Sequence, residues 1–351
     1  MTGAGAILVG DGIENPGNAL AMLHAAQMYG VGCSFRDTKG LRESETLRVA
    51  LNGRFPATTE NEIQASHSRI IAFDNLPGAA DVYGFDPGKD LAVLVGNERR
   101  GLSHRFRDLS TDAVQIPMLS RRINCLNVAA ASAVALHYLC HVRVGPMAKR
   151  RNPASRRPEL LLVGAEDHIE LGSAIRSAAA FGWGRAFIED REQVWFGCDR
   201  IKRSEGRATA RRSRNVIRLV PCSAGARHSF SEVTVITTSR VGVPLHRARL
   251  ARGPGQLVVI PDETRVHLAE EPWGRLGQDV QFAHLDTAVD DFTYHYRLVA
   301  TVALAEVSRQ VGRRPPEFPR PRRRPPVYDR VLELASETVG EDVWLEELLD
   351  Y

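Results

Sequence analysis

The stretch Leu94-Val-Gly-Asn-Glu-Arg-Arg-Gly-Leu-Ser103 places two glycines and two polar side chains directly after an apolar run. Glycines at the carboxyl end of a strand allow the backbone to come close to a ligand. Here they are Gly96 and Gly101, and Asn97 and Glu98 add hydrogen-bonding side chains between them. The pattern predicts a ligand contact. A purely structural turn is the alternative that this stretch alone leaves open.

A second stretch, Gln115-Ile-Pro-Met-Leu-Ser-Arg-Arg-Ile-Asn-Cys-Leu-Asn-Val128, leads into an alanine-rich helix that runs past His137. Its proline interrupts a strand, because proline has no N–H to donate. Arg121 and Arg122 then make the loop basic, which suits contact with a substrate phosphate. Asn127 stands where the helix begins, either as a helix cap or as a site residue.

The elements that would position these loops form an internal repeat. Each copy has an opening strand, an alanine-rich helix, a later buried strand and a closing helix. The corresponding ranges are 6–9 and 160–163, 19–29 and 171–181, 91–95 and 256–260, and 128–139 and 298–307. Strands that alternate with helices indicate an α/β fold with a largely parallel sheet. We favour two related halves, fused as a pseudo-dimer, over two unrelated α/β domains.

Basic, proline-containing segments divide the chain. Residues 146–158 predict a linker between a first domain at 1–145 and a second domain at 159–312. The last segment, 313–351, opens with a Pro/Arg-rich stretch whose prolines forbid a helix. It ends at 328–349 in a pattern typical of an acidic amphipathic helix.

Composition limits the class of protein. Hydrophobic residues make up 43% and charged residues 25% of the 351 residues, which is typical of a soluble globular protein. We expect no membrane partner, because the sequence has neither a long apolar run nor a signal peptide. The five cysteines form no close pairs and the histidines lack metal-ligand spacing. These features predict a reduced, cytoplasmic protein without a metal site.

Arginine is clustered, although the net charge is only +4. Within residues 200–214, the candidate contacts to a phosphate backbone are Arg203, Arg207, Arg211 and Arg212. A solvated charged loop is the alternative. The sequence contains no aromatic RNA-binding module, so RNA would be recognised through its shape and its phosphates.

Together, the two loop stretches resemble the SpoU/TrmH branch of the SPOUT RNA methyltransferases. That family has a Gly-Asn-Glu-x-x-Gly-Leu-Ser loop and an Ile-Pro-Met…Ser-Leu-Asn-Val loop and helix, and both occur here in that order. The family's third motif, Asn-Pro-x-Asn, matches Asn15-Pro-Gly-Asn18.

The resemblance implies S-adenosylmethionine as cofactor and a deep trefoil knot in the first of two SPOUT-like α/β-knot domains. Positions that match the implied cofactor site are Leu94, Gly96, Asn97, Gly101, Ile116, Met118, Cys125 and Leu126. Asn15, Glu98 and Asn127 match positions of the implied catalytic site. The implied reaction is 2′-O-methylation of ribose in tRNA or rRNA.

This sequence departs from the family pattern in informative places. Cys125 replaces the usual serine, and the loop before it is one residue longer. His24 stands where the family has its catalytic arginine, whereas Arg176 occupies that position in the second half. The second half in turn has lost the cofactor loops, with Val259-Ile-Pro-Asp-Glu263 in place of the Gly-Asn-Glu loop.

The halves therefore complement each other in their motifs. We expect a degenerate second half that contributes Arg176 to a single active site in the first half. A retained packing arginine is the alternative reading of Arg176. Two other functions stay open: a SPOUT site used on a small molecule or peptide, and a non-catalytic protein that binds RNA or S-adenosylmethionine. The chain would act as an internal pseudo-dimer, as a monomer or as a homodimer.

Overall fold

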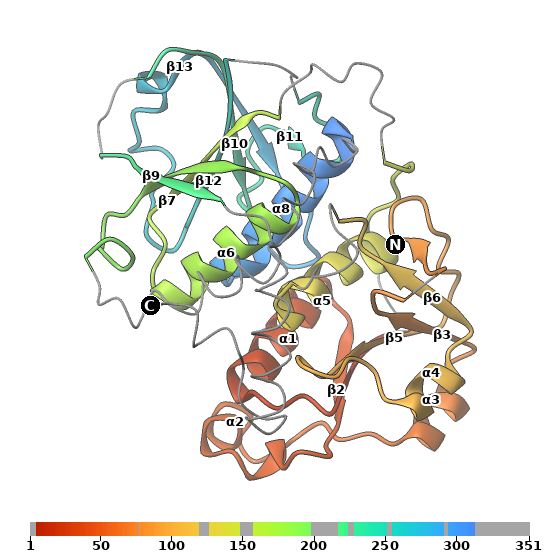
Figure 1. The fold of residues 1–351 in the computed structure, drawn as a ribbon. Coiled ribbons are helices and arrows are strands. Elements are labelled where there is room, and N and C mark those ends of the chain that lie inside the picture. The colour runs from red at the N-terminus through yellow and green to blue at the C-terminus, as the bar shows by residue number, and fades with distance from the viewer. Residues whose placement is uncertain are drawn as a thin grey trace, which may run out of the picture. The chain divides into compact units, whose positions relative to one another are not determined.

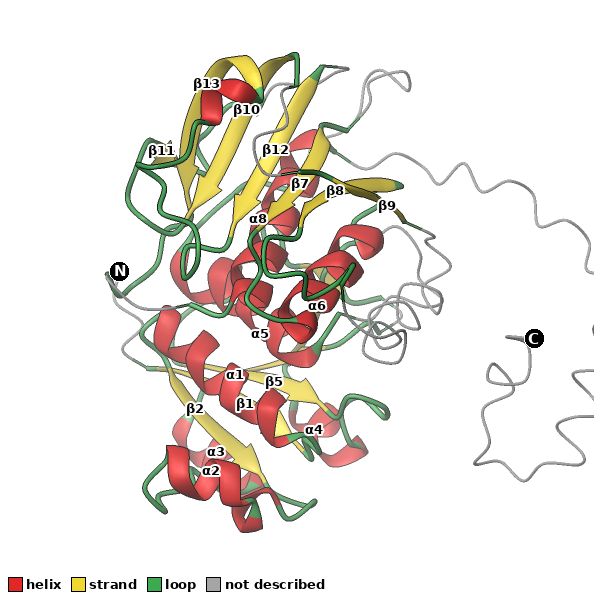
Figure 2. Cartoon of the chain, turned by 90° about the vertical axis from the view of Figure 1, so that its left-hand side faces the viewer, coloured by secondary structure: helices red, strands yellow, loops and turns green. Residues whose placement is uncertain are grey.

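Two parallel sheets form the framework of the computed structural model (Figures 1 and 2). It describes residues 5–76, 78–118, 126–147, 157–197, 217–223, 228–250, 255–290 and 294–312. All of these residues fall within one unit, 1–313, which is separate from 314–351. We call residues 5–147 the first half and residues 157–312 the second half.

The first sheet has the strand order β2-β1-β5-β3-β6-β4, with every described pair parallel. Its strands are β1 (Ala6–Asp11), β2 (Gly32–Arg36), β3 (Arg69–Phe73), β4 (Ala80–Asp81), β5 (Leu91–Gly96) and β6 (Asp112–Gln115). The central strand β5 is an unbroken apolar run because both faces of the sheet are covered.

The second sheet has the order β11-β13-β10-β12-β7-β8-β9, also with parallel pairs. Its strands are β7 (Glu159–Val163), β8 (Arg185–Glu189), β9 (Arg218–Pro221), β10 (Phe230–Thr237), β11 (Val243–Pro244), β12 (Gln256–Pro261) and β13 (Gly277–His284). From β8 to β11 this order repeats that of the first sheet, and β9 is an additional edge strand.

The α/β fold with parallel sheets is confirmed. Each sheet lies within one of the two predicted domain ranges, and the domain boundaries themselves stay a prediction. The expected knot depends on the path of residues 119–125, which lie outside the described residues.

Four long helices lie between the sheets in Figure 2. They are α1 (Pro16–Met28), α5 (Val128–Leu136), α6 (His168–Ala180) and α8 (Tyr296–Val311). Shorter helical segments are η1 (Leu41–Glu43), α2 (Glu45–Ala50), α3 (Glu60–Ser66), α4 (His104–Leu109), η2 (His137–His141) and η3 (Trp273–Arg275).

Side-chain caps explain where α1 and α6 begin. Asn15 accepts hydrogen bonds from the backbone N–H groups of Gly17 (2.8 Å) and Asn18 (3.1 Å), so α1 begins at Pro16, before the predicted residue 19. Asp167 caps α6 in the same way, through the N–H groups of Ile169 (2.7 Å) and Glu170 (2.8 Å). The predicted starts were late because the periodic apolar pattern begins only after the capped first turn.

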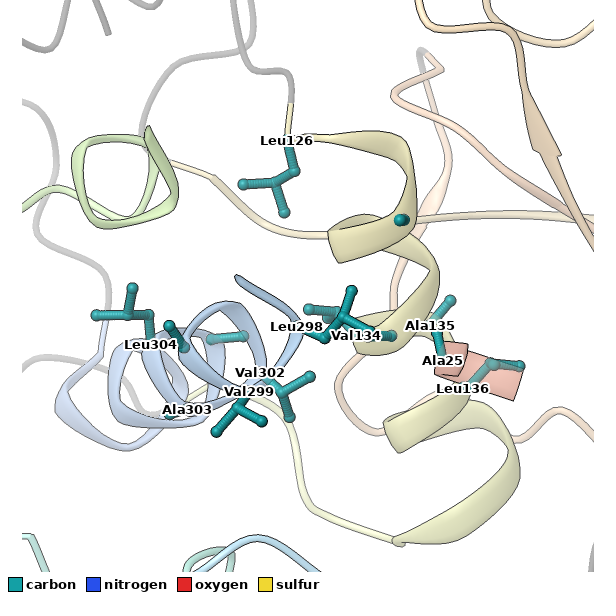
Figure 3. Close-up of a cluster of buried hydrophobic side chains, with 14 of the residues drawn as sticks. Ala25, Leu126, Val134, Ala135, Leu136, Leu298, Val299, Val302, Ala303 and Leu304 are labelled. Carbon is teal, nitrogen blue, oxygen red and sulfur yellow. The ribbon is translucent and has the colours of Figure 1, made fainter. Parts of the chain in front are cut away.

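The two halves share a hydrophobic core. Helix α5 packs against α1 and α8, and α8 packs against α6. Figure 3 shows this cluster, with Val134 of α5 and Leu298 of α8 among its fully buried members. Two tyrosines of the first half also form hydrogen bonds with α8: the Tyr138 hydroxyl donates to Glu306 Oε2 at 2.7 Å and the Tyr83 hydroxyl donates to the Ala305 carbonyl at 3.2 Å.

Candidate active site

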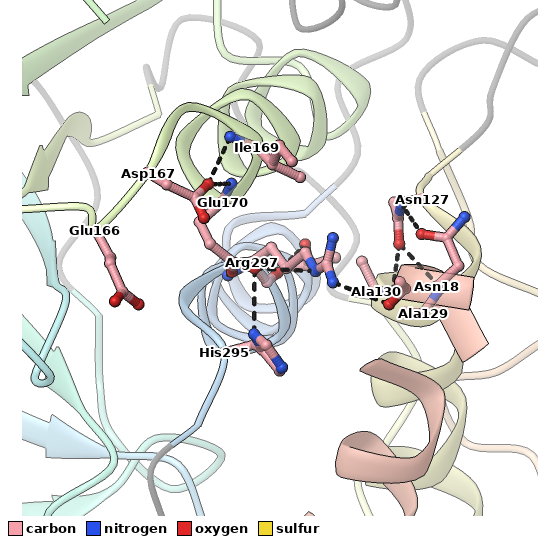
Figure 4. Close-up of polar contacts among 12 residues, drawn as sticks. Asn18, Asn127, Ala129, Ala130, Glu166, Asp167, Ile169, Glu170, His295 and Arg297 are labelled. Carbon is pink, nitrogen blue, oxygen red and sulfur yellow. Dashed lines mark hydrogen bonds and ion pairs between the residues drawn. The ribbon is translucent and has the colours of Figure 1, made fainter. Parts of the chain in front are cut away.

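Asn127 joins the start of α5 to the start of α1 (Figure 4). Its Oδ1 accepts hydrogen bonds from the N–H groups of Ala129 (3.0 Å) and Ala130 (3.4 Å), which caps α5. Its Nδ2 donates to Oδ1 of Asn18 at 2.9 Å. The predicted capping role is therefore present, and the side chain also has a long-range partner that the sequence did not reveal.

Glu98 extends this link to the loop after β5. Its carboxylate accepts hydrogen bonds from the N–H groups of Glu14 (3.2 Å) and Asn15 (3.3 Å) and from Nδ2 of Asn18 (2.9 Å). A chain of side chains, Glu98–Asn18–Asn127, thus connects three loop ends. The structure brings together three of the predicted catalytic residues, Asn15, Glu98 and Asn127, and gives each of them a positioning role.

The loop after β5 turns sharply around its two glycines. Asn97 and Gly101 exchange backbone hydrogen bonds of 3.1 and 2.9 Å, and Gly101 has a φ of +69°. A Cβ on Gly96 would lie 2.1 Å from the Gly101 carbonyl carbon and from the Leu102 nitrogen. Nδ2 of Asn97, a buried side chain, donates to the Gly12 carbonyl at 2.7 Å. The close approach at Gly96 is therefore to its own loop, as in a structural turn, and the predicted contact with a ligand stays a prediction.

A cavity of about 270 Å³ opens beside this loop, at the carboxyl ends of β3 and β5. Seven predicted site residues line it: Gly96, Asn97, Glu98, Gly101, Ile116, Met118 and Leu126. Leu94, also predicted, is fully buried within β5 and does not line it. Further lining residues, which were not predicted as site residues, are Phe73, Asp74, Asn75, Val95, Arg99, Gln115, Val128 and Ala131.

Two of these residues, Asp74 and Asn75, could have been predicted from their place in the sequence. Asp74 and Asn75 directly follow β3, which pairs with β5 in the sheet. Because the carboxyl ends of parallel strands meet at one edge, polar residues there belong to the same site. The pairing of β3 with β5 was not predicted, so their proximity was not either.

The second half reaches this region through Arg297, near the start of α8. Its guanidinium lies 3.2 Å from Glu170 Oε1 and donates to the Gly17 carbonyl of the first half at 3.4 Å (Figure 4). His295 also contacts Glu170, at 3.2 Å. The sequence did not predict this contact between the halves.

His24 and Arg176 occupy equivalent helix positions. Helix α1 begins at Pro16 and α6 begins at His168, so each of the two side chains lies eight residues after the start of its helix. The His24 ring stacks on His295 of the second half, with 4.7 Å between ring centroids. Burial lowers the pKa of His24, and the neighbouring His295 and Arg297 lower it further. Arg176 is half-buried on α6.

Several predicted residues lie outside the described part of the chain. They are Arg121, Arg122 and Cys125 in the first half, and Arg203, Arg207, Arg211 and Arg212 in the second. Within the residues that are described, no group of three or more His, Cys, Asp or Glu side chains is arranged to hold a metal ion. No described helix is both long and apolar enough to cross a bilayer.

Comparisons with known proteins find similarity to the first half. The SpoU rRNA Methylase family matches residues 5–137. The 23S rRNA (uridine(2479)-2′-O)-methyltransferase of Streptomyces viridochromogenes is 29% identical over 121 residues, which are 34% of this chain and 42% of that protein. The chain spans about half the length of the curated relatives it matches.

Two solved structures are among the similar ones. The SpoU methyltransferase AviRb from S. viridochromogenes, in complex with AdoMet, has 24% identity and a TM-score of 0.33, covering 38% of this chain and 55% of that chain. The AdoMet-bound rRNA methyltransferase from Sinorhizobium meliloti has 25% identity and a TM-score of 0.33, with the same coverage of 38% and 55%.

The family match agrees with the motifs and with the geometry around Gly96, Glu98 and Asn127, and it implies S-adenosylmethionine as cofactor. Residues 5–137 of this chain match the SpoU rRNA Methylase family model, so the first half is similar to the SpoU rRNA methylases.

Proposed function

We propose that this chain is an S-adenosylmethionine-dependent RNA methyltransferase that modifies a ribose 2′-hydroxyl of tRNA or rRNA. The observation that supports this most is the cavity beside Gly96, a position with no room for a side chain. The hydrogen bonds of Asn18 with Glu98 and Asn127 hold the surrounding loops in place. The family matched by residues 5–137 and the 2′-O-methylating relative support the choice of reaction.

The walls of this cavity suit a nucleoside cofactor that carries an amino group. Ile116, Leu126 and Val128 offer apolar surface, and Asp74 offers a carboxylate. A side chain at position 96 would obstruct the loop that forms one wall. The volume of about 270 Å³ is just below the range of roughly 300–1,000 Å³ usual for ligand sites. Bound there, S-adenosylmethionine supplies an electrophilic methyl group.

The second half would supply the arginine that the first half lacks at the position of His24. A ribose 2′-hydroxyl is a poor nucleophile near neutral pH and needs a base or electrostatic help. His24 of α1 contacts His295 at the start of α8. Since the two sheets have the same strand order, the equivalent residue of α6, Arg176, is expected to face the start of α5 at Asn127. Arg176 would then act on the substrate beside the cofactor cavity.

This assignment includes three further proposals. The second half is a degenerate SPOUT-like domain, and the two halves form an internal pseudo-dimer. The first half contains a deep trefoil knot. Arg121 and Arg122, together with Arg203, Arg207, Arg211 and Arg212, bind RNA phosphates, so RNA binding should weaken steeply as salt rises.

The deciding experiment compares Arg176→Ala with His24→Ala, its matched position in the first half. Transfer of labelled methyl groups to total tRNA and rRNA is measured, with nucleoside analysis of the product. We expect Arg176→Ala to lower the rate about 100-fold or more, with cofactor affinity in calorimetry unchanged. His24→Ala should stay within a few-fold of the wild-type rate. Full activity in Arg176→Ala contradicts the complementation.

Two other outcomes would replace the proposed reaction. If the wild-type protein binds S-adenosylmethionine but no nucleoside gains a methyl group, a non-catalytic role or a small-molecule or peptide substrate is favoured. If it binds no S-adenosylmethionine, the proposed function itself is wrong.

A further inference from the structure

The second half contains a cavity of its own, larger than the one beside Gly96. Its volume is about 620 Å³, within the range of roughly 300–1,000 Å³ of small-molecule sites. It lies beyond the carboxyl ends of β10 and β12, next to the first turn of α8. No step of the proposed methyl transfer uses it.

The position of this cavity corresponds to that of the first. Gly96 ends β5 opposite Asp11 of β1, and Pro261 ends β12 opposite Val163 of β7. Pro261 lines the second cavity as Gly96 lines the first. The carboxyl edge of a parallel sheet is where such folds bind ligands. The architecture therefore preserves a ligand position whose walls have changed.

The walls are predominantly acidic. Three carboxylates line the cavity, from Asp262, Glu263 and Asp290, against one guanidinium, from Arg240. Arg240 is already paired with Asp290, at 2.8 Å. The wall thus carries two carboxylates in excess of its cations.

Those two carboxylates have hydrogen bonds but no counter-charge. Asp262, which is 2% exposed, accepts from the Glu166 N–H at 3.0 Å and from the Thr264 hydroxyl at 2.7 Å. Glu263 accepts from the N–H and hydroxyl groups of Thr238 and Ser239. Among the described residues, neither carboxylate makes an ion pair. Buried charge of one sign favours a ligand of the other.

Aromatic rings form another part of the wall. Tyr294 and Tyr296 both line the cavity, and an aromatic face attracts a cation that comes within about 6 Å. The described residues include no cluster of three or more metal-ligating side chains. The volume, the excess of carboxylates and the aromatic faces together suit an organic cation better than a metal ion.

We propose that the cavity lined by Asp262, Glu263, Asp290 and Tyr294 binds a small organic cation, either an ammonium or a sulfonium compound. Carboxylates supply the attraction, tyrosine rings cover the apolar part of the ligand, and Arg240 competes with it for Asp290. Binding does not require the first cavity to hold a cofactor, so the site exists whether or not the proposed methyl transfer is correct.

The test is calorimetric titration of the full-length protein at low and high salt, in two arms. Spermidine probes an ammonium ligand. S-adenosylmethionine probes a sulfonium ligand, and S-adenosylhomocysteine, whose sulfur is a neutral thioether, is its control. A second bound molecule per chain would indicate binding in the second cavity. Because the whole chain has a net charge of +4, nonspecific uptake of a cation is disfavoured. We expect saturable binding in one arm, which weakens as salt rises.

Substitutions at Tyr294 and at Arg240 should change the affinity for the cation in opposite directions. Tyr294→Leu should weaken binding about tenfold relative to Tyr294→Phe, because only phenylalanine keeps the aromatic face. Arg240→Ala should tighten binding, since it removes the competing guanidinium. Thermal unfolding checks that each variant is folded. If a Tyr294 variant is not folded, the exposed residues Arg240 and Asp290 provide the test instead, and Asp290→Asn should weaken binding. Absence of saturable binding in both arms, or affinities that none of these changes alters, overturns the proposal.

Discussion

At the scale of single residues, Gly96 has almost no room for a side chain. A Cβ there would meet backbone atoms of Gly101 and Leu102 at 2.1 Å, so the loop of residues 97–102 must move in Gly96→Ala. We expect at least a tenfold loss of S-adenosylmethionine affinity in calorimetry, together with a lower melting temperature. Gly184→Ala is the matched control, because its Cβ meets nothing within 4 Å. Equal behaviour of the two variants would show that the loop is not a tight constraint.

Asn127 performs two tasks that substitution can separate. Asn127→Ala removes both the α5 cap and the hydrogen bond to Asn18. Loss of such a cap costs about 1 kcal/mol of the free energy of unfolding, measured by denaturant titration. Asn127→Asp keeps the capping oxygen and loses only the Nδ2 donor, so it should be the more stable of the two while still losing methyl-transfer activity. If both variants lower stability equally, the cap is not the source of the loss.

The sequence revealed the residues of the site better than their partners. Gly96, Glu98 and Asn127 were predictable because strand ends, glycine turns and helix starts have local signatures. The hydrogen bonds of Asn18 to Glu98 and Asn127 join residues more than 70 positions apart, and no local pattern reports such pairs. Arg297 was missed for the same reason, since its contact with Gly17 spans the two halves.

At the scale of elements, the junction between the halves depends on helices α5 and α8. The Tyr138 hydroxyl donates to Glu306, which is fully buried and also paired with Arg309 at 2.5 Å. Tyr138→Phe leaves a buried carboxylate oxygen without this donor, which costs about 1.5–3 kcal/mol. Tyr83→Phe removes a neutral bond to the Ala305 carbonyl and should cost only about 0.5–1.5 kcal/mol. Denaturant unfolding should show this order, and a reversed order would contradict it.

Elements were predictable to the extent that their pattern is local. The alternating strands and alanine-rich helices predicted the α/β fold. The repeat predicted that β1 corresponds to β7 and α5 to α8 in the two halves. The order of strands within each sheet was not predictable, because it depends on which strands pair across long connections. The π-helical turn His137–His141 after α5 also had no signature in the sequence, which suggested one helix through 139.

At the scale of the whole molecule, acidification should loosen the junction between the halves. His24, His137, His141 and His246 all have pKa values lowered by burial. Neighbouring cationic groups lower the pKa of His24 and His137 further, whereas Asp286 opposes the lowering at His141 and His246. For His24 and His137 these groups include His295, His246 and Arg309 of the second half. Protonation of His24 and His137 would therefore place like charges on both sides of the junction.

The direction of the effect follows from proton binding. A free histidine has a pKa of about 6.5, and these histidines titrate lower in the folded protein. Below about pH 6.5 the unfolded chain therefore binds more protons than the folded chain, so the free energy of unfolding falls as the pH falls. Above that pH both states hold neutral histidine, and this contribution to the pH dependence vanishes.

His137 should account for a large share of this dependence. Its side chain is 1% exposed, lies edge-on to Tyr138, and has no hydrogen-bond partner at either ring nitrogen. A fully buried histidine that stays neutral costs about 1 kcal/mol of stability for each pH unit below 6.5. In His137→Phe, the difference in free energy of unfolding between pH 7.5 and pH 5.5 should shrink by about that amount. Arg48→Ala, an exposed change far from the histidines, should leave the difference unaltered. A pH dependence that is the same in His137→Phe and wild type would mean that His137 is protonated in the folded protein, and the buried junction would then have to contain a counter-charge for it.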